Sequence, residues 1–184
     1  SRLTGLTWSA IVRLTHMRCR TLSIHYFRPQ GSEEMNRLDG KIAIVFGAGP
    51  NIGGTIAHFM AREGAHVVVS DIDTATAQKT VEFIVARGLK ASALTGDALD
   101  EDAVADIVAT THDRHGHIDI VVNMAGKVHW SPVVDMDLKA WRDAVLSFPT
   151  AGMLTTKHAA RTMIADRRPG SIIHLLSTAA HFGE

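Results

Sequence analysis

Glycines crowd the segment from Gly47 to Gly54, which reads Gly-Ala-Gly-Pro-Asn-Ile-Gly-Gly. Residues without a side chain let the backbone approach a diphosphate closely, and a helix that begins in such a turn presents free N–H groups and a partial positive charge. The pattern therefore predicts a diphosphate-binding turn in which Gly47, Asn51, Ile52 and Gly53 contact the ligand. The alternative interpretation is a tight turn that binds nothing.

Asp71 follows a run of apolar β-branched residues and stands 18 residues after Gly53. At that spacing a carboxylate can accept hydrogen bonds from the ribose hydroxyls of a dinucleotide held by the glycine turn. It would repel a 2′-phosphate, because like charges about 4 Å apart cost roughly 4 kcal/mol at an effective dielectric constant near 20. Arg62 is the only lysine or arginine between Gly47 and Thr76. We therefore expect NAD rather than NADP as the cofactor, and Asp73 is a second candidate for the carboxylate.

The elements that must position these residues alternate along the chain. Short apolar runs predict five strands, and segments with helical periodicity separate them. The expected strands are 42–46, 66–70, 91–95, 118–122 and 171–176. This alternation predicts an α/β fold with right-handed crossovers, in which a doubly wound parallel sheet has helices on both faces.

Caps and periodicity also predict details of the helices. We expect Thr74 and Asp100 to cap two of them and Pro149 to break or kink the last. Trp141 has the spacing of a core residue, and His174 that of a packing residue in a strand. The expected apolar positions are Ile52, Ile56, Phe59 and Met60; Ala77, Val81, Ile84 and Val85; Val104, Ile107 and Val108; and Leu138, Trp141 and Val145.

Composition narrows the class of protein. The chain has 184 residues, with 19 Lys plus Arg balanced by 19 Asp plus Glu, which argues against partners held by global charge, such as nucleic acid or a membrane surface. Its apolar residues never form a run long enough to span a bilayer. Cys19 is the only cysteine, so an intrachain disulfide is impossible and a cytoplasmic location is expected.

Residues 1–34 read differently from the remainder. The first 32 contain five arginines and no acidic residue. An Arg-rich, acid-free tract is typical of a mitochondrial transit peptide. We favour a disordered or non-native leader that precedes a start at Met35, and keep a mitochondrial location as the minor alternative. The expected domains are therefore this extension and a nucleotide-binding domain over 35–184.

From Met35 onward the sequence resembles the N-terminal part of a short-chain dehydrogenase/reductase, a family with a Rossmann-like fold. The glycine turn is similar to that family's Thr-Gly-x-x-x-Gly-x-Gly motif, with Phe46 in place of Thr and Asn51 in place of the middle Gly. The resemblance implies that Asp97 and Ala98 contact adenine. It also implies that the segment Asn123-Met124-Ala125-Gly126 lies beside the cofactor, although Met124 replaces an Asn.

The same resemblance implies a catalytic Ser at Ser177, together with a Tyr and a Lys four residues after it. No Tyr-x-x-x-Lys occurs, because Tyr26 is the only tyrosine, and Phe148 stands at the family's Asn position. We therefore expect a truncated and inactive form of an NAD-dependent oxidoreductase that lacks its C-terminal strands. Its full-length parent would act on a small alcohol or carbonyl compound and form a homo-oligomer. A non-catalytic dinucleotide-binding module and a non-functional fragment are the alternatives.

Three histidines, His112, His115 and His117, cluster near Asp113 and Asp119 and could mimic a metal site. The resemblance places the end of a surface helix there, where histidines suit the helix dipole. We expect no metal.

Overall fold

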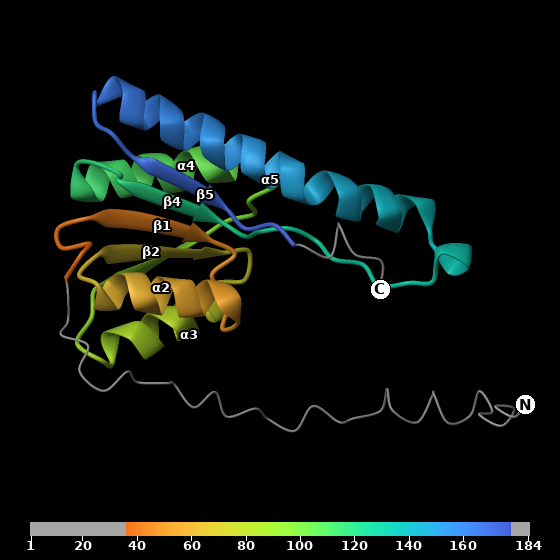
Figure 1. Cartoon of the computed structure of the whole chain (residues 1–184), viewed down its shortest axis with the longest axis horizontal. Coiled ribbons are helices and arrows are strands. Elements are labelled where there is room, and N and C mark those ends of the chain that lie inside the picture. The colour runs from red at the N-terminus through yellow and green to blue at the C-terminus, as the bar shows by residue number, and fades with distance from the viewer. Residues whose placement is uncertain (1–35, 178–184) are drawn as a thin grey trace, which may run out of the picture. The chain divides into compact units, whose positions relative to one another are not determined.

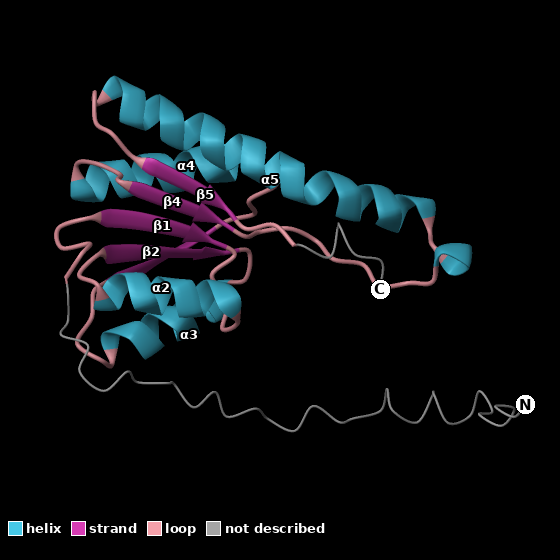
Figure 2. Cartoon of the chain, in the orientation of Figure 1, coloured by secondary structure: helices cyan, strands magenta, loops and turns pink. Residues whose placement is uncertain are grey.

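The computed structural model describes residues 36–177, so the expectations for residues 1–34 lie outside the described part. Its five strands form one sheet in the order β3-β2-β1-β4-β5. Every pairing is parallel, and Figure 2 shows the arrows pointing the same way. The predicted doubly wound parallel sheet is confirmed. The strands are β1 (Ile42–Phe46), β2 (His66–Asp71), β3 (Ala91–Thr95), β4 (Ile120–Asn123) and β5 (Ser171–His174).

In the described part of the chain, four α-helices cover the two faces of the sheet. In Figure 1, α2 (Ile52–Arg62) and α3 (Thr74–Val85) lie on one face, and α4 (Glu101–His115) and α5 (Leu138–Ala165) lie on the other. Alternate residues of β1 pack against the helices on opposite faces of the sheet, because successive side chains of a strand point to opposite faces. Ala43 and Val45 pack with α2 and α3, whereas Ile44 and Phe46 pack with α4 and α5. The whole of β1 is therefore buried.

Three helices begin at an aspartate whose carboxylate accepts hydrogen bonds from the first turn. Asp100 caps α4, as predicted, and Asp137 caps α5. The prediction for α3 was wrong: its cap is Asp73, whose Oδ1 accepts a hydrogen bond from Thr76 N at 2.6 Å, and Thr74 is the first helical residue. Asp73 takes this role because its extended backbone lets its short carboxylate reach back to that N–H group.

Several predicted core positions are exposed. The face that α2 buries consists mainly of small residues, and Ile52 is 61% exposed. Val85 is the last residue of α3 and is exposed. The buried face of this helix includes Thr80 instead. The prediction that Trp141 belongs to the core was wrong, since it is 49% exposed. Trp141 belongs to the first half of α5, and Figure 1 shows that this half extends past the carboxyl ends of the strands.

Pro149 does not end α5, which is continuous from Leu138 to Ala165. Proline inside a helix removes one backbone hydrogen bond and costs about 3 kcal/mol relative to alanine. The buried residues Ser147, Ala151 and Leu154 anchor the helix on both sides of the proline. Their packing offsets the local loss.

Three strands have ends that differ from the prediction. The second strand ends at Asp71 rather than 70. The fourth runs from Ile120 to Asn123 rather than from 118 to 122, and the fifth ends at His174 rather than 176. Within the described residues β5 is one edge strand of the sheet and β3 is the other. No helix between residues 36 and 177 combines the length and the apolar character needed to cross a membrane.

Candidate functional site

A cleft of about 330 Å³ lies at the carboxyl ends of the strands. In open parallel sheets, ligands bind at this edge, where neighbouring connections leave on opposite faces. Eight of the ten predicted cofactor-binding residues line it: Gly47, Asn51, Gly53, Asp71, Asp97, Ala98, Ala125 and Gly126. Ile52 and Asn123 do not line it.

The glycine turn between β1 and α2 is folded so tightly that side chains do not fit. Gly47 has φ +72°, and a Cβ there would lie 3.0 Å from Ala125 N. A Cβ on Gly53 would collide with the carbonyl oxygen of Gly47, and one on Gly54 would lie 2.5 Å from the carbonyl oxygen of Gly49. The turn therefore needs glycine at these positions, and its bare backbone forms the floor of the cleft.

Two hydrogen bonds from neighbouring elements fix Ala48 at the middle of the turn. Its N–H donates to Ser70 O at 3.0 Å, and its carbonyl accepts a hydrogen bond from Thr80 Oγ1 at 2.9 Å. Thr80 is buried in α3. Sequence reasoning missed this residue, because nothing in the local pattern shows that α3 faces the glycine turn.

The N-terminus of α2 points into this region without a side-chain cap. Asn51 makes no capping hydrogen bond, and the first turn carries no acidic residue. The leading N–H groups of such a helix favour a bound anion. The arrangement fits a diphosphate held against Gly47, Asn51 and Gly53.

Asp71 ends β2 and faces the glycine turn. A Cβ on Gly49 would lie 3.5 Å from Asp71 Oδ2, while Asp71 Oδ1 accepts a hydrogen bond from Asp73 N at 3.1 Å. Asp73 itself caps α3 and does not line the cleft. The hydrogen bond from Thr76 holds the pKa of Asp73 below its usual value. Asp71 is therefore the carboxylate that is available to a ligand.

The two remaining walls come from the segments after β3 and β4. Asp97 Oδ1 accepts a hydrogen bond from Leu99 N at 2.9 Å, which shapes the turn that carries Ala98. Asn123 is buried, and its Oδ1 accepts a hydrogen bond from Ala125 N at 3.1 Å. Asn123 thus shapes the wall of the cleft from behind.

Sequence reasoning also missed cleft residues that are direct neighbours of predicted ones. Ser70 precedes Asp71, Gly96 precedes Asp97, and Lys127 follows Gly126. Extending each motif by one residue would have found them.

Ser177, the predicted catalytic residue, is the last described residue and is exposed. It is not among the described residues that line the cleft. Phe148 borders a second, apolar pocket of about 640 Å³ with His174 and Leu176. His174 is exposed rather than packed in the core, and its Nε2 lies 2.9 Å from Thr156 Oγ1.

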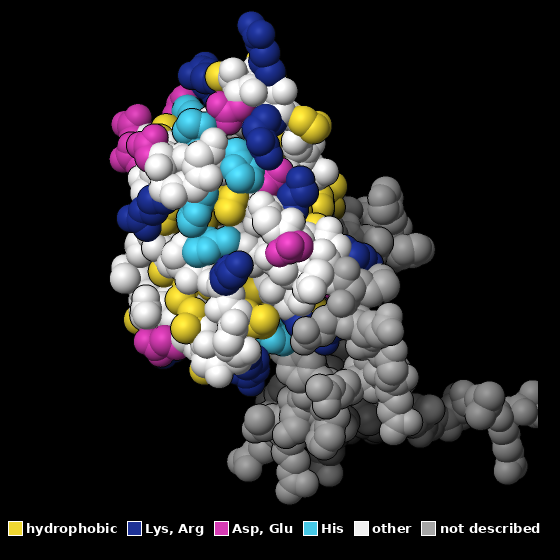
Figure 3. Space-filling view, turned by 90° about the vertical axis from the view of Figure 1, so that its left-hand side faces the viewer, with side chains coloured by type: hydrophobic (Ala, Val, Ile, Leu, Met, Phe, Trp, Pro, Cys, Tyr) yellow, Lys and Arg dark blue, Asp and Glu magenta, His cyan; other side chains and the backbone are white. Residues whose placement is uncertain are grey.

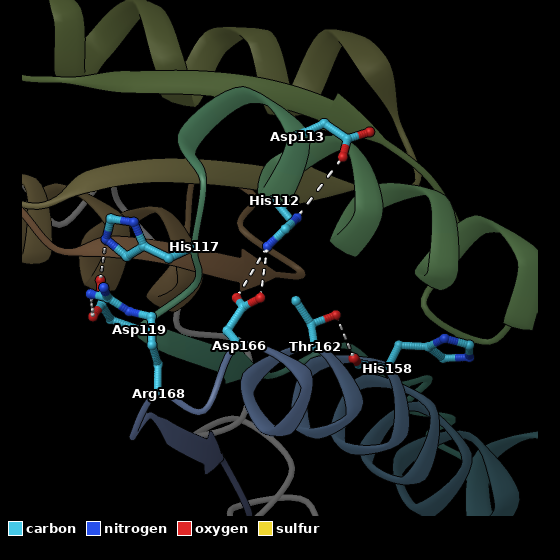
Figure 4. Close-up of polar contacts among 8 residues, drawn as sticks. All are labelled: His112, Asp113, His117, Asp119, His158, Thr162, Asp166 and Arg168. Carbon is cyan, nitrogen blue, oxygen red and sulfur yellow. Dashed lines mark hydrogen bonds and ion pairs between the residues drawn. The ribbon is translucent and has the colours of Figure 1, made fainter.

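Each of the three clustered histidines contacts a different side chain. Figure 3, which views the side where the strands begin, shows histidines gathered on this face. His112 Nε2 lies 3.1 Å from Asp166 Oδ2, and His117 Nε2 lies 3.1 Å from Asp119 Oδ2 (Figure 4). The ring of His115 packs 4.3 Å from that of His66, and burial lowers the pKa of both. Over residues 36–177, no three His, Cys, Asp or Glu side chains are grouped to hold a metal ion.

Comparison with known proteins places this geometry in a family. The family model described as short chain dehydrogenase matches residues 41–184. The chain is 37% identical over 149 residues to a sorbitol dehydrogenase of Cereibacter sphaeroides, covering 80% of this chain and 57% of that protein. It is 36% identical over 140 residues to a gluconate 5-dehydrogenase of Gluconobacter oxydans, covering 76% and 54%.

Solved structures agree with this assignment. A 7α-hydroxysteroid dehydrogenase complexed with NADH and 7-oxo glycochenodeoxycholic acid superposes with a TM-score of 0.75 at 33% identity, covering 82% of this chain and 58% of that chain. A short-chain type dehydrogenase/reductase from Mycobacterium marinum gives 0.77 at 30% identity, covering 82% and 61%. The protein belongs to the short-chain dehydrogenase family, as the sequence predicted. The chain spans little more than half the length of the curated relatives that it matches.

Proposed function

We propose that this chain is the dinucleotide-binding part of an NAD-dependent oxidoreductase. The observation that carries the proposal is the position of the Asp71 carboxylate, which faces the glycine turn beside an uncapped helix N-terminus. In this arrangement the turn holds the diphosphate and Asp71 accepts hydrogen bonds from the adenosine ribose. A 2′-phosphate would bring a second negative charge to Asp71, so NAD is preferred over NADP.

Adenine would lie beside Asp97 and Ala98, which line the cleft together with Ala125 and Gly126 on the β4 side. Bound NAD would supply the nicotinamide carbon that accepts or gives up a hydride. Family membership and relatives named for sorbitol and gluconate support a small alcohol or carbonyl compound as the substrate. Ser177 would steady the substrate oxygen.

The printed sequence contains no candidate for the acid–base pair that the family resemblance implies, because its only tyrosine is Tyr26. A positioned acid–base group contributes about 10²–10⁴ to a rate. We therefore propose that these 184 residues bind the cofactor and turn over substrate poorly by themselves.

A non-catalytic dinucleotide-binding module is the second candidate. The aromatic ring of Phe148 favours it, because a phenyl group cannot hold the water that an asparagine holds at the family's equivalent position. Both candidates require a cleft that binds NAD.

Thermal unfolding of the full chain with millimolar NAD or NADP tests that shared requirement. A ligand at about 100 times its Kd stabilises the folded state by roughly 2.7 kcal/mol, which raises Tm by several degrees. We expect NAD to raise Tm more than NADP does. A cooperative transition that neither nucleotide shifts would contradict the proposal.

A further inference from the structure

Lys127 is the only basic residue among the described residues that line the cleft. It follows Gly126 in the segment after β4, and the other charged residues of the lining are Asp71 and Asp97. Without Lys127 the cleft would offer two carboxylates and no cationic side chain to a ligand whose diphosphate carries negative charge. Its position therefore bears directly on how such a ligand is held.

The backbone of Lys127 is fixed by Ser147 of α5. Lys127 N donates a hydrogen bond to Ser147 Oγ at 2.8 Å, and Ser147 Oγ lies 2.9 Å from Ala144 O, to which it donates. Because the hydroxyl proton is directed to the helix backbone, a lone pair remains to accept from Lys127. Ser147 is 3% exposed, so water competes little for this contact.

The ammonium group of Lys127 has no carboxylate within ion-pair distance in the part of the chain that the structure describes. The nearby acid, Asp143, is instead held by Lys139 Nζ at 2.6 Å. That hydrogen bond is the main cause of the lowered pKa of Asp143, and attraction to Lys127 is a smaller one. Lys127 is therefore an exposed, unneutralised cation beside a cleft that fits an anion.

We propose that Lys127 is a binding residue for the phosphate groups of the dinucleotide and that Ser147 positions it. This inference rests on the proposed function. The sheet order places Asp71 of β2 on one side of the glycine turn and the β4 segment with Lys127 on the other. A dinucleotide whose ribose lies at Asp71 then extends its diphosphate toward Lys127. The flexible lysine side chain supplies a point charge to those oxygens.

The test is calorimetric titration of the full chain with NAD, ADP and adenosine, in wild type and in Lys127→Gln. We expect Lys127→Gln to weaken the binding of NAD and ADP about tenfold at low salt, as for the loss of one charge-assisted contact. Adenosine, which has no phosphate, should bind both proteins equally. The difference for NAD should shrink at high salt because the contact is exposed.

Three further variants show whether a change in NAD affinity comes from the charge of residue 127 or from a disturbed fold. Lys127→Arg should retain most of the affinity. Lys90→Gln should bind NAD as wild type does, because Lys90 is exposed, directly precedes β3 at the opposite end of the strands, and does not line the cleft. Ser147→Ala should weaken NAD binding in wild type but add little in the Lys127→Gln background. Unfolding midpoints measured alongside show whether each variant remains folded.

The outcomes distinguish this inference from the function on which it rests. If wild type binds NAD and folded Lys127→Gln binds it equally well, the role of Lys127 is wrong and the proposed function stands. Equal losses for NAD and adenosine would also overturn the role in phosphate binding. If wild type does not bind NAD, the proposed function itself fails.

Discussion

The aromatic ring of Phe148 in α5 lies directly against Gly126 in the segment that follows β4. A Cβ on Gly126 would collide with three carbon atoms of that ring. The cleft wall therefore approaches α5 as closely as it does only because residue 126 has no side chain. Phe148 therefore packs against a segment that we propose contacts the cofactor.

Replacing Gly126 by alanine should destabilise the protein by about 1–3 kcal/mol, because the ring or the wall must move. The displaced wall should also weaken NAD binding. Gly152→Ala in α5, the helix that carries Phe148, is a matched control. A Cβ at residue 152 meets nothing closer than 3.7 Å, and alanine favours a helix over glycine by up to about 1 kcal/mol, so this variant should not be destabilised. Urea unfolding and NAD titration measure both effects. A neutral Gly126→Ala substitution would contradict the contact.

Removing the charge of Asp71 should change the cofactor preference. Asp71→Asn should lower the affinity for NAD and raise that for NADP, since the repulsion of a 2′-phosphate is lost. Asp73→Asn is the control: asparagine caps helices about as well as aspartate does, so this variant should keep the α3 cap and leave the preference unchanged. The ratio of the two dissociation constants, measured for all three proteins, decides the matter. An unchanged ratio in Asp71→Asn would refute the assignment.

The hydroxyl of Thr80 should support both stability and binding. Thr80→Val keeps the shape of the side chain but leaves the Ala48 carbonyl without its 2.9 Å hydrogen bond, at a cost of about 1–3 kcal/mol. The loosened glycine turn should also bind NAD less tightly. Thr95→Val, at an exposed site, should change neither quantity appreciably. Full affinity for NAD in Thr80→Val would show that the turn does not depend on α3.

Asp119 should make the protein sensitive to acid. Its buried carboxylate accepts hydrogen bonds from Ile42 N at 2.9 Å and Lys41 Nζ at 3.1 Å, and it lies close to His117 and Arg168 (Figure 4). Burial alone would raise the pKa of Asp119, but these hydrogen bonds and the nearby positive charges hold it below its usual value.

Because the folded pKa of Asp119 is depressed, its stabilising contribution is complete above the unfolded value of about 3.9 and is lost as pH falls through the folded pKa. Asp119→Asn should cost about 2 kcal/mol at neutral pH. The difference from wild type should shrink below about pH 4. Urea unfolding of both proteins from neutral to acidic pH measures this. A difference that stays constant with pH would contradict the role of the charge.

The sequence predicted which elements carry the glycine turn and Asp71. The glycine turn and Asp71 lie on either side of one helix, so their spacing and the alternation of strands placed them at one edge of the sheet. Three contacts of the site depend on which face of a distant helix packs against a loop. They join Thr80 to Ala48, Ser147 to Lys127 and Phe148 to Gly126. Periodicity does not specify that choice. Trp141 shows the same limit, because its helical spacing is that of a core residue although the sheet ends before it.

A crystal structure of the full chain grown with millimolar NAD tests the central claim most directly. We expect the diphosphate against Gly47 and Gly53 at the N-terminus of α2, and the adenosine ribose hydroxyls within hydrogen-bonding distance of the Asp71 carboxylate. A nucleotide bound elsewhere, or one whose ribose turns away from Asp71, would contradict the account.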